Sequence, residues 1–246
     1  MKFRLLPVAF LFTTASFLLS ASISLAYRDD YPPYKFGEKP PAHLVAVELL
    51  KGKGHYNSAD GRVTASCKKD EKGNLTFSFM VDGKLLWGRE CSSVAPSEFY
   101  KTDLNKDGLE DYIVITWGGG AGLGSHISNV DIFLARKGGT FDAISYEGFD
   151  PGLEDFVDLN SDGKYEAIIE TFYGGKSHNY FVYNVYKFAQ GRLVNADKKF
   201  PGFPKFIQYK NKNNDQDTRQ LTSAERRRFV KKVNSEIKHE ILSVSQ

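Results

Sequence analysis

Two short segments of the chain carry oxygen-bearing side chains at alternate positions. Each segment has them at its first, third, fifth and ninth residues. The residues are Asp103, Asn105, Asp107 and Asp111 in the first segment, and Asp158, Asn160, Asp162 and Glu166 in the second. Calcium binds six to eight hard oxygen ligands in a flexible shell, and a loop that turns back on itself can supply them from alternate residues. The pattern therefore predicts two calcium sites.

The remaining positions of both segments agree with this prediction. The sixth residue is Gly108 or Gly163, where a sharp turn is easiest without a Cβ. The seventh, Leu109 or Lys164, would contribute its backbone carbonyl oxygen. Three carboxylates in each loop would repel one another without a cation. A solvated Asp-Asn turn is the alternative interpretation, but two copies in the same register favour the metal.

The two loops belong to an internal repeat. Each runs into an apolar strand, predicted at 112–116 and 167–171, and then into an aromatic residue followed by glycines. A Ser-His pair and a further strand follow, at 130–135 and 181–188. Position twelve of each loop lies within the apolar strand, whereas an EF-hand needs an acidic residue there and helices on both sides. The predicted unit is strand, calcium loop, strand.

These two Asp-x-Asn-x-Asp-Gly-x-x-Asp/Glu loops resemble those of FG-GAP or VCBS-type repeats, the units of integrin α-subunit-like β-propellers and of many exported bacterial proteins. The resemblance covers about residues 97–197. It implies that each loop joins adjacent strands of a blade and holds calcium through the positions named above. Because only two units are visible and a closed ring needs four or more blades, we expect a mainly β protein with two blade-like antiparallel repeats in a compact β domain.

The N-terminal 42 residues are expected to lie outside the folded domain. Lys2 and Arg4 precede an apolar stretch that ends in small residues at 24–26, which is typical of a signal peptide occupying residues 1–26. An uncleaved membrane anchor is the alternative. Residues 27–42 are rich in proline and tyrosine and predict an extended arm. We therefore expect a secreted or periplasmic protein with no membrane span after cleavage.

Residues 43–96 predict a small β meander, with strands at 62–68, 75–81 and 84–89. The only two cysteines, Cys67 and Cys91, lie in this part. In an exported protein a disulfide between them is the natural expectation. A redox pair is the alternative, but the spacing is not C-x-x-C.

The C-terminal part, residues 198–246, predicts a loop followed by a basic amphipathic helix. Thr222 and Glu225 form a capping box, and Phe229, Val233, Ile237 and Ile241 recur at helical spacing. This part holds 12 basic and 5 acidic residues, although the whole chain has a formal net charge of only +3. The asymmetry allows docking on the protein body or on an anionic surface, but it does not argue for nucleic acid.

Other chemistry-bearing residues have several interpretations. His126 and His178 occupy matching positions and would form a zinc site only if the units met face to face. The glycine run at 118–124 lacks the lysine and Ser/Thr of a phosphate loop. Glu170 and the acidic group Asp150, Glu154 and Asp155 are candidate acids without an evident base or nucleophile. Six aromatic residues could form a binding surface. They follow the strand after each loop or lie in or next to the further strand of the second unit, namely Trp117, Phe172, Tyr173, Tyr180, Tyr183 and Tyr186.

The sequence therefore predicts an exported calcium-binding β-repeat module with Ca2+ in two sites. We expect a binding or structural protein rather than an enzyme, in contact with an unidentified protein or glycan. The alternative is a calcium-dependent hydrolase that acts on glycans.

Overall fold

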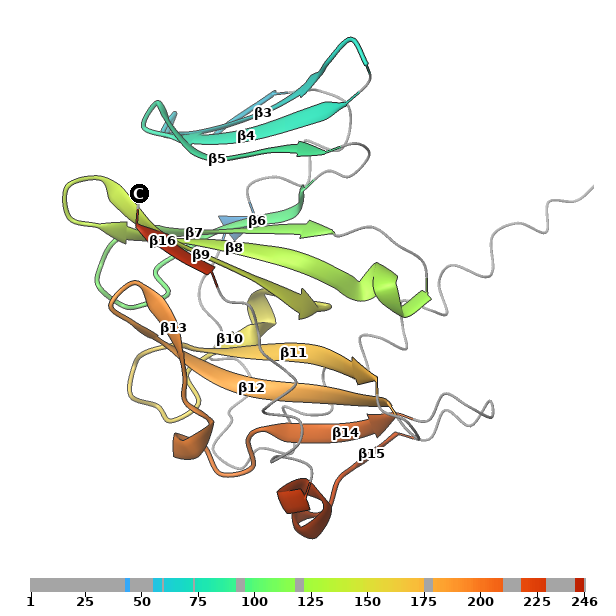
Figure 1. Ribbon diagram of the computed structural model, residues 1–246. Helices are drawn as coiled ribbons and strands as arrows, with labels where there is room; N and C mark the ends of the chain where they lie inside the picture. Colours follow the sequence, from blue (N-terminus) through green and yellow to red (C-terminus); the bar gives the residue numbers. More distant parts are fainter. Residues whose placement is uncertain are drawn as a thin grey trace, which may run out of the picture.

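A computed structural model describes most of the central part of the chain. The described residues are 43–44, 55–58, 60–72, 74–91, 96–117, 122–174, 179–209, 218–228 and 242–245. The predicted signal peptide (1–26) and extended arm (27–42) lie outside these residues. Three antiparallel sheets account for nearly all of the described structure (Figure 1). The expectation of a mainly β protein is confirmed.

The first sheet is a four-stranded meander. Its strands, in spatial and sequence order, are β2 (His55–Asn57), β3 (Val63–Lys69), β4 (Leu75–Val81) and β5 (Lys84–Cys91). Alternate residues are buried on one face, such as Phe77 and Phe79, while the residues between them are partly exposed. This period of two is what a sheet with one covered face requires. The predicted meander is confirmed, with β4 at its predicted bounds.

The second sheet has six strands in the order β1-β6-β7-β8-β9-β16. Their bounds are β1 (His43–Leu44), β6 (Pro96–Thr102), β7 (Asp111–Trp117), β8 (Ile127–Arg136), β9 (Thr140–Phe149) and β16 (Leu242–Ser245). A 3-10 helix, η2 (Gly122–His126), precedes β8. The last strand of the chain therefore returns to the outer edge of β9, which the sequence analysis did not predict.

The third sheet also has six strands, with β12 in contact with three others. The bounds are β10 (Phe156–Val157), β11 (Glu166–Gly174), β12 (Asn179–Ala189), β13 (Arg192–Asn195), β14 (Lys205–Tyr209) and β15 (Thr218–Gln220). The β13 strand pairs with 186–189 of β12, and β14 pairs with 179–183. Two short 3-10 helices, η3 (Leu153–Asp155) and η4 (Asp197–Lys199), precede β10 and follow β13.

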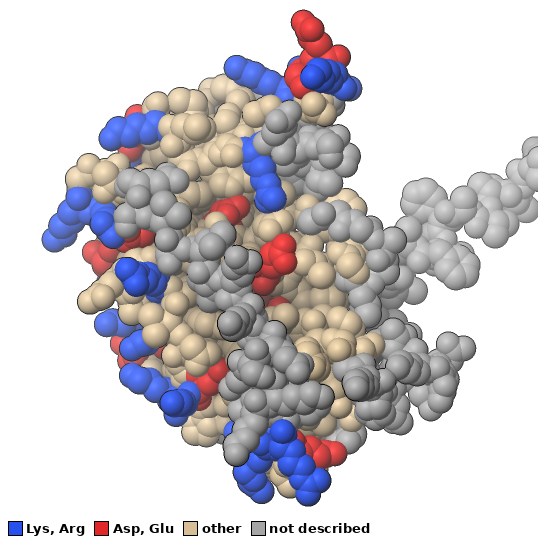
Figure 2. All heavy atoms as spheres, in the orientation of Figure 1, with Lys and Arg blue, Asp and Glu red and all other residues tan. Residues whose placement is uncertain are grey.

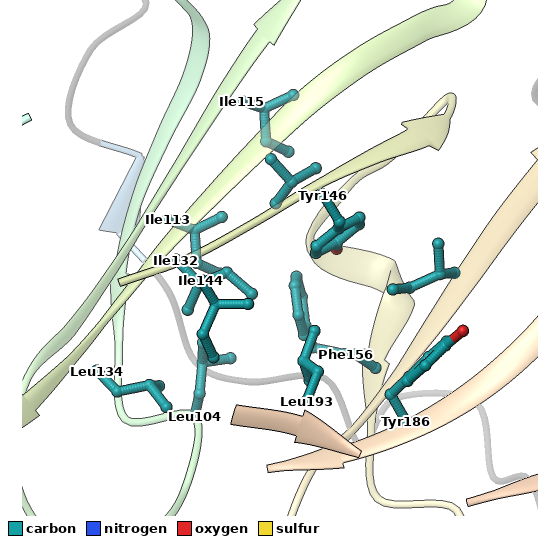
Figure 3. Packing of buried hydrophobic residues seen from close by; sticks show 13 residues of the cluster. Leu104, Ile113, Ile115, Ile132, Leu134, Ile144, Tyr146, Phe156, Tyr186 and Leu193 are labelled. Atoms are coloured by element: carbon teal, nitrogen blue, oxygen red, sulfur yellow. The ribbon is translucent and has the colours of Figure 1, made fainter. Parts of the chain in front are cut away.

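The three sheets lie one above another, and the second sheet is buried on both faces (Figure 1). Tyr112 and Val114 of β7 pack with the core of the first sheet. Ile113 and Ile115 point the other way, into a core shared with the third sheet (Figure 3). The continuous apolar run of β7 follows from this position, because a strand covered on both faces has no polar side.

The two predicted repeats fold in the same way. In the first, β6, a loop, β7, β8 and β9 follow one another as hydrogen-bonded neighbours, and in the second β10, a loop, β11, β12 and β13 do so. The strand β9 is ten residues long, whereas β13 has four. The short β13 leaves one edge of β12 without a partner strand at residues 179–183, and β14 pairs there.

The C-terminal part differs from its prediction. Residues 198–246 were expected to form a loop and one helix, but they also contain β14, β15 and β16. Phe206 and Ile207 of β14 are adjacent in sequence and both buried, in two separate hydrophobic clusters, as in a strand that is covered on both faces. Residues 223–228 are helical, and the capping box is confirmed by a 2.9 Å bond from Thr222 N to Glu225 Oε2.

The predicted helical stripe at Phe229, Val233, Ile237 and Ile241 lies outside the described residues. Among the residues that the structure does describe, no helix is long and apolar enough to cross a membrane.

The two cysteines lie on strands that are not neighbours. Cys67 is opposite Phe77, and Cys91 is opposite Leu75, so that β4 separates them. Strands two apart in a sheet are about 10 Å apart, whereas bridged cysteines usually have Cα atoms about 4.4–6.8 Å apart. The side chain of Cys91 lies outside the described residues, and the disulfide stays a prediction that this register does not favour.

Candidate functional site

The two acidic loops lie side by side at one end of the stacked sheets, which we call the loop end (Figure 1). One loop joins β6 to β7 and the other joins β10 to β11. A cavity of about 340 Å3 is lined by Asn105 of the first loop and by Asn160 and Asp162 of the second. Residues that are 55 positions apart in the sequence therefore share one site region.

The two loops have the same internal hydrogen bonds. In the first, Asp103 accepts from the backbone N–H groups of Asp107 at 3.1 Å and Gly108 at 3.0 Å. In the second, Asp158 accepts from Asp162 at 3.1 Å and Gly163 at 2.8 Å. The first acidic residue of each loop thus closes the turn over the residues that follow it.

The middle of each loop is also matched. Asn105 Oδ1 accepts from Asp107 N, and Asn160 Oδ1 from Asp162 N, both at 3.0 Å. Asp107 then accepts from Leu109 N and Asp162 from Lys164 N, both at 2.9 Å. These are Asx-type turns, in which a short side chain binds the backbone two residues on.

Positive φ angles explain the glycines in the loops. Gly108 has φ of 86° and Gly163 of 82°. The residues two positions earlier, Lys106 and Ser161, also lie in the left-handed region at 59° and 58°. A residue with a Cβ is strained there. In each loop, glycine occupies the position with the larger positive φ.

The ninth residue of each loop is a buried anchor. Asp111 is fully buried and accepts from Leu104 N and Ala135 N, both at 2.8 Å. Glu166 is 4% exposed and accepts from Leu159 N at 3.0 Å. Leu104 and Leu159 are themselves buried in the core. Each loop is therefore held to the sheet by one carboxylate and one leucine.

Burial raises the pKa of Asp111 to about 7. The N–H groups of Ala135 and Leu104 lower it, and the negative charges of Asp107 and Asp103 raise it. Burial likewise raises the pKa of Glu166 to about 7, with Asp162 and Asp158 adding to the effect. Both anchors are therefore charged only at a free-energy cost, since the desolvated carboxylates lie beside other anions.

The donor chemistry of these loops fits a hard divalent cation. Carboxylate, amide and carbonyl oxygens are the ligands that calcium takes, and a carboxylate oxygen that accepts one N–H bond keeps a second lone pair. Within the described residues, however, no group of three or more His, Cys, Asp or Glu side chains converges at metal-binding spacing. A calcium shell here would also draw on Asn oxygens and backbone carbonyls.

The predicted histidine site is only partly described. His126 Nδ1 lies 2.8 Å from Asp150 Oδ1, and its ring stacks on Phe149 at 5.2 Å. The matching residue of the second unit, His178, lies outside the described residues, as does the glycine cluster at 118–121. The His126–Asp150 pair was not predicted, because 24 residues and a whole hairpin separate the two side chains.

The candidate acids lie in separate surroundings. Glu170 is 6% exposed in β11, opposite Tyr183 of β12. Asp155 is also buried and accepts from Gly152 N at 2.9 Å, so it stabilises the start of η3. The structure therefore assigns Asp155 a turn-forming role.

The aromatic surface expected on β12 is largely internal. Tyr180, Tyr183 and Tyr186 are each at least nine-tenths buried. Trp117, by contrast, is 39% exposed at the end of β7. The tyrosines of β12 are buried because both faces of the third sheet are covered, so alternation gives no exposed side.

The sequence analysis did not single out Glu98, a half-buried acid within the first unit. Glu98 and Tyr100 of β6 are hydrogen-bonded to each other. Burial raises the pKa of Glu98, and the charge of Glu154 adds to this. The two residues are at i and i+2 of one strand, so their side chains lie on the same face of the sheet. This spacing is the only sequence signal that could have linked them.

Comparison with known proteins gives no relative for this chain. No family model, curated protein or solved structure matches it. The function must therefore be argued from the loops and their surroundings.

Proposed function

We propose that this protein is an exported, calcium-stabilised β-repeat module that binds a protein or glycan partner. The observation that carries the proposal is the pair of loops with matching hydrogen bonds, in each of which two negative charges raise the pKa of a buried acid. Mutual repulsion of these carboxylates opposes closure of the loops, and a divalent cation would offset it. The FG-GAP or VCBS-type resemblance of the loops supports the same interpretation.

Each loop would hold one Ca2+. The ligands of the first site are Asp103, Asn105, Asp107, the backbone carbonyl of Leu109, and Asp111. Those of the second site are Asp158, Asn160, Asp162, the backbone carbonyl of Lys164, and Glu166. The ion would supply positive charge at the loop end and fix the shape of both loops. A binding role is favoured over catalysis because one of the candidate acids, Asp155, has a structural role as the acceptor of a backbone N–H bond in η3.

The proposal is tested on the mature chain after removal of metal with a chelator. Calorimetric titration with calcium should show two sites, and calcium should raise Tm, since a ligand that binds only the native state stabilises it by about 2.7 kcal/mol per site at 100 times Kd. Magnesium serves as the control ion, because it demands a tighter octahedral shell. Identical melting with and without chelator would overturn the calcium sites.

Export and the binding role need their own measurements. The mature N-terminus should be Tyr27, which mass spectrometry of the exported protein can determine. Glycan-array and hydrolysis assays separate the two functional classes. Calcium-dependent turnover that Glu170→Gln abolishes would replace the binding role with the hydrolase alternative.

A further inference from the structure

A cleft of about 350 Å3 opens at the loop end between the first and second sheets. We call it the hairpin cleft. The residues that the argument uses are Arg62, Lys84, Leu109, Tyr112, Lys137 and Phe141. It lies beside the first acidic loop, whose residues 108–110 form one of its walls. Its volume falls within the range of small-molecule sites and exceeds what a bare inorganic anion fills.

The acids of the cleft are already neutralised. The guanidinium of Arg62 donates to Asp82 through two nitrogens, each at 3.0 Å, and to Glu110 at 3.0 Å. Glu110 also lies 2.6 Å from Lys101 Nζ. The carboxylates therefore hold the walls together and add little negative charge to the opening.

Two lysines supply the surplus positive charge. Lys84, at the start of β5, and Lys137, in the turn between β8 and β9, are both exposed. Neither makes an ion pair with another residue in the described part of the chain. They approach the opening from different sheets. Figure 2 shows Lys and Arg side chains, with Asp and Glu side chains among them, along the left flank, where the loop end lies in Figure 1.

The inner part of the cleft combines apolar surface with one unused polar group. The ring of Phe141 meets that of Tyr112 edge-on, with centroids 5.9 Å apart. Tyr112 is 1% exposed, and its hydroxyl has no hydrogen-bond partner in the described structure. The hydroxyl is fully buried, so it packs beneath the cleft surface and does not contact a ligand.

We propose that the hairpin cleft binds an acidic sugar, with its anionic group between Lys84 and Lys137 and its ring against Phe141 and Leu109. Cations recognise the carboxylate or sulfate, and the aromatic and aliphatic walls cover the apolar face of the ring. This combination of an anion and a ring is that of a uronate or sulfated saccharide. The inference deepens the proposed binding role and rests on it for the choice of a glycan partner.

The position of the cleft couples it to the first calcium loop. Gly108 and Leu109 line its wall directly after Asp107, one of the proposed calcium ligands. Calcium that orders this loop would also order the wall, so we expect the sugar to bind more tightly in calcium than in chelator. Binding of equal strength in both conditions would contradict the coupling between the first acidic loop and the cleft and leave the sugar site standing.

The experiment is isothermal titration of the mature protein with digalacturonate at low salt, in calcium and in chelator. Lys84→Gln and Lys137→Gln should each weaken binding about tenfold, the loss expected for one charge-assisted contact. Lys187→Gln, in the separate cavity between the two acidic loops, is the matched control and should bind as the unmodified protein does.

Four results would overturn the inference. The first is the absence of binding at millimolar digalacturonate in calcium, with the protein folded by circular dichroism. The second is equal binding of neutral digalactose or of an acidic dipeptide, which would point to general sugar or anion binding. The third is an unchanged Kd in both lysine variants. Loss of binding in Lys187→Gln alone would move the site to the other cavity and would also overturn it.

Discussion

The ammonium group of Lys106 lies 4.6 Å from the centre of the Tyr165 ring. Lys106 is at the tip of the first acidic loop and Tyr165 is the penultimate residue of the second. This cation–π contact joins the two loops directly, although the sequence separates them by a full repeat. The two proposed calcium sites are therefore neighbours in one region of the surface.

The contact between Lys106 and Tyr165 should be measurable as a coupling free energy. A double-mutant cycle with Lys106→Gln and Tyr165→Leu is expected to give about 0.5–1 kcal/mol, the strength of such contacts near the surface. Urea unfolding of the four proteins in chelator provides the measurement. Additive effects of the two substitutions would show that the loops fold independently.

The anchor and the tip of the first loop should respond differently to substitution. Asp111→Ala leaves the buried N–H groups of Leu104 and Ala135 without an acceptor and should cost about 2–4 kcal/mol of unfolding free energy in chelator, with a further loss in calcium because Asp111 is also a proposed ligand. Asp107→Ala, at an exposed position, should cost less than about 1 kcal/mol in chelator, but should remove the calcium-dependent gain of that loop. Asp162→Ala should do the same in the second loop.

Chemical unfolding of these variants, with calcium and with chelator, separates anchoring from metal binding. Equal losses for Asp107→Ala and Asp111→Ala in chelator would contradict this division of roles.

Glu98 should make the stability of the protein depend on pH. Burial raises the pKa of Glu98 above its ordinary value of 4.5, and the hydrogen bond from Tyr100 opposes this only in part. The folded state therefore holds the proton more tightly than the unfolded state does. The contribution of Glu98 to unfolding free energy is most favourable below about pH 4.5, and it falls as the pH rises through the raised folded pKa.

Glu98→Gln removes this charge while it keeps an oxygen for the Tyr100 hydroxyl. The variant should gain unfolding free energy relative to the unmodified protein at about pH 8 and lose that advantage near pH 4. Urea titrations across this range provide the measurement. Glu147→Gln, at an exposed position of β9, is the control and should show no such trend. A pH-independent difference for Glu98→Gln would contradict the buried-charge explanation.

The sequence by itself determined the features that depend on neighbouring residues. The loop bonds join residues that are two to seven positions apart, such as Gly108 N to Asp103 Oδ2, so alternate acids and a glycine were enough to predict both loops. The strands β4, β7 and β11 follow from apolar runs and turn residues in the same way. Their bounds agree with the predictions within a few residues.

Only the tertiary structure decided which of these pieces meet. Lys106 reaches Tyr165, Lys84 and Lys137 line one cleft, and β16 returns to β9, because sheets stack and strands pair over long stretches of chain. Such contacts depend on burying apolar faces against one another, and alternation along a single strand does not name its partner sheet. The exposure of the β12 tyrosines was left open for this reason, since the sequence does not show that both faces of that sheet are covered.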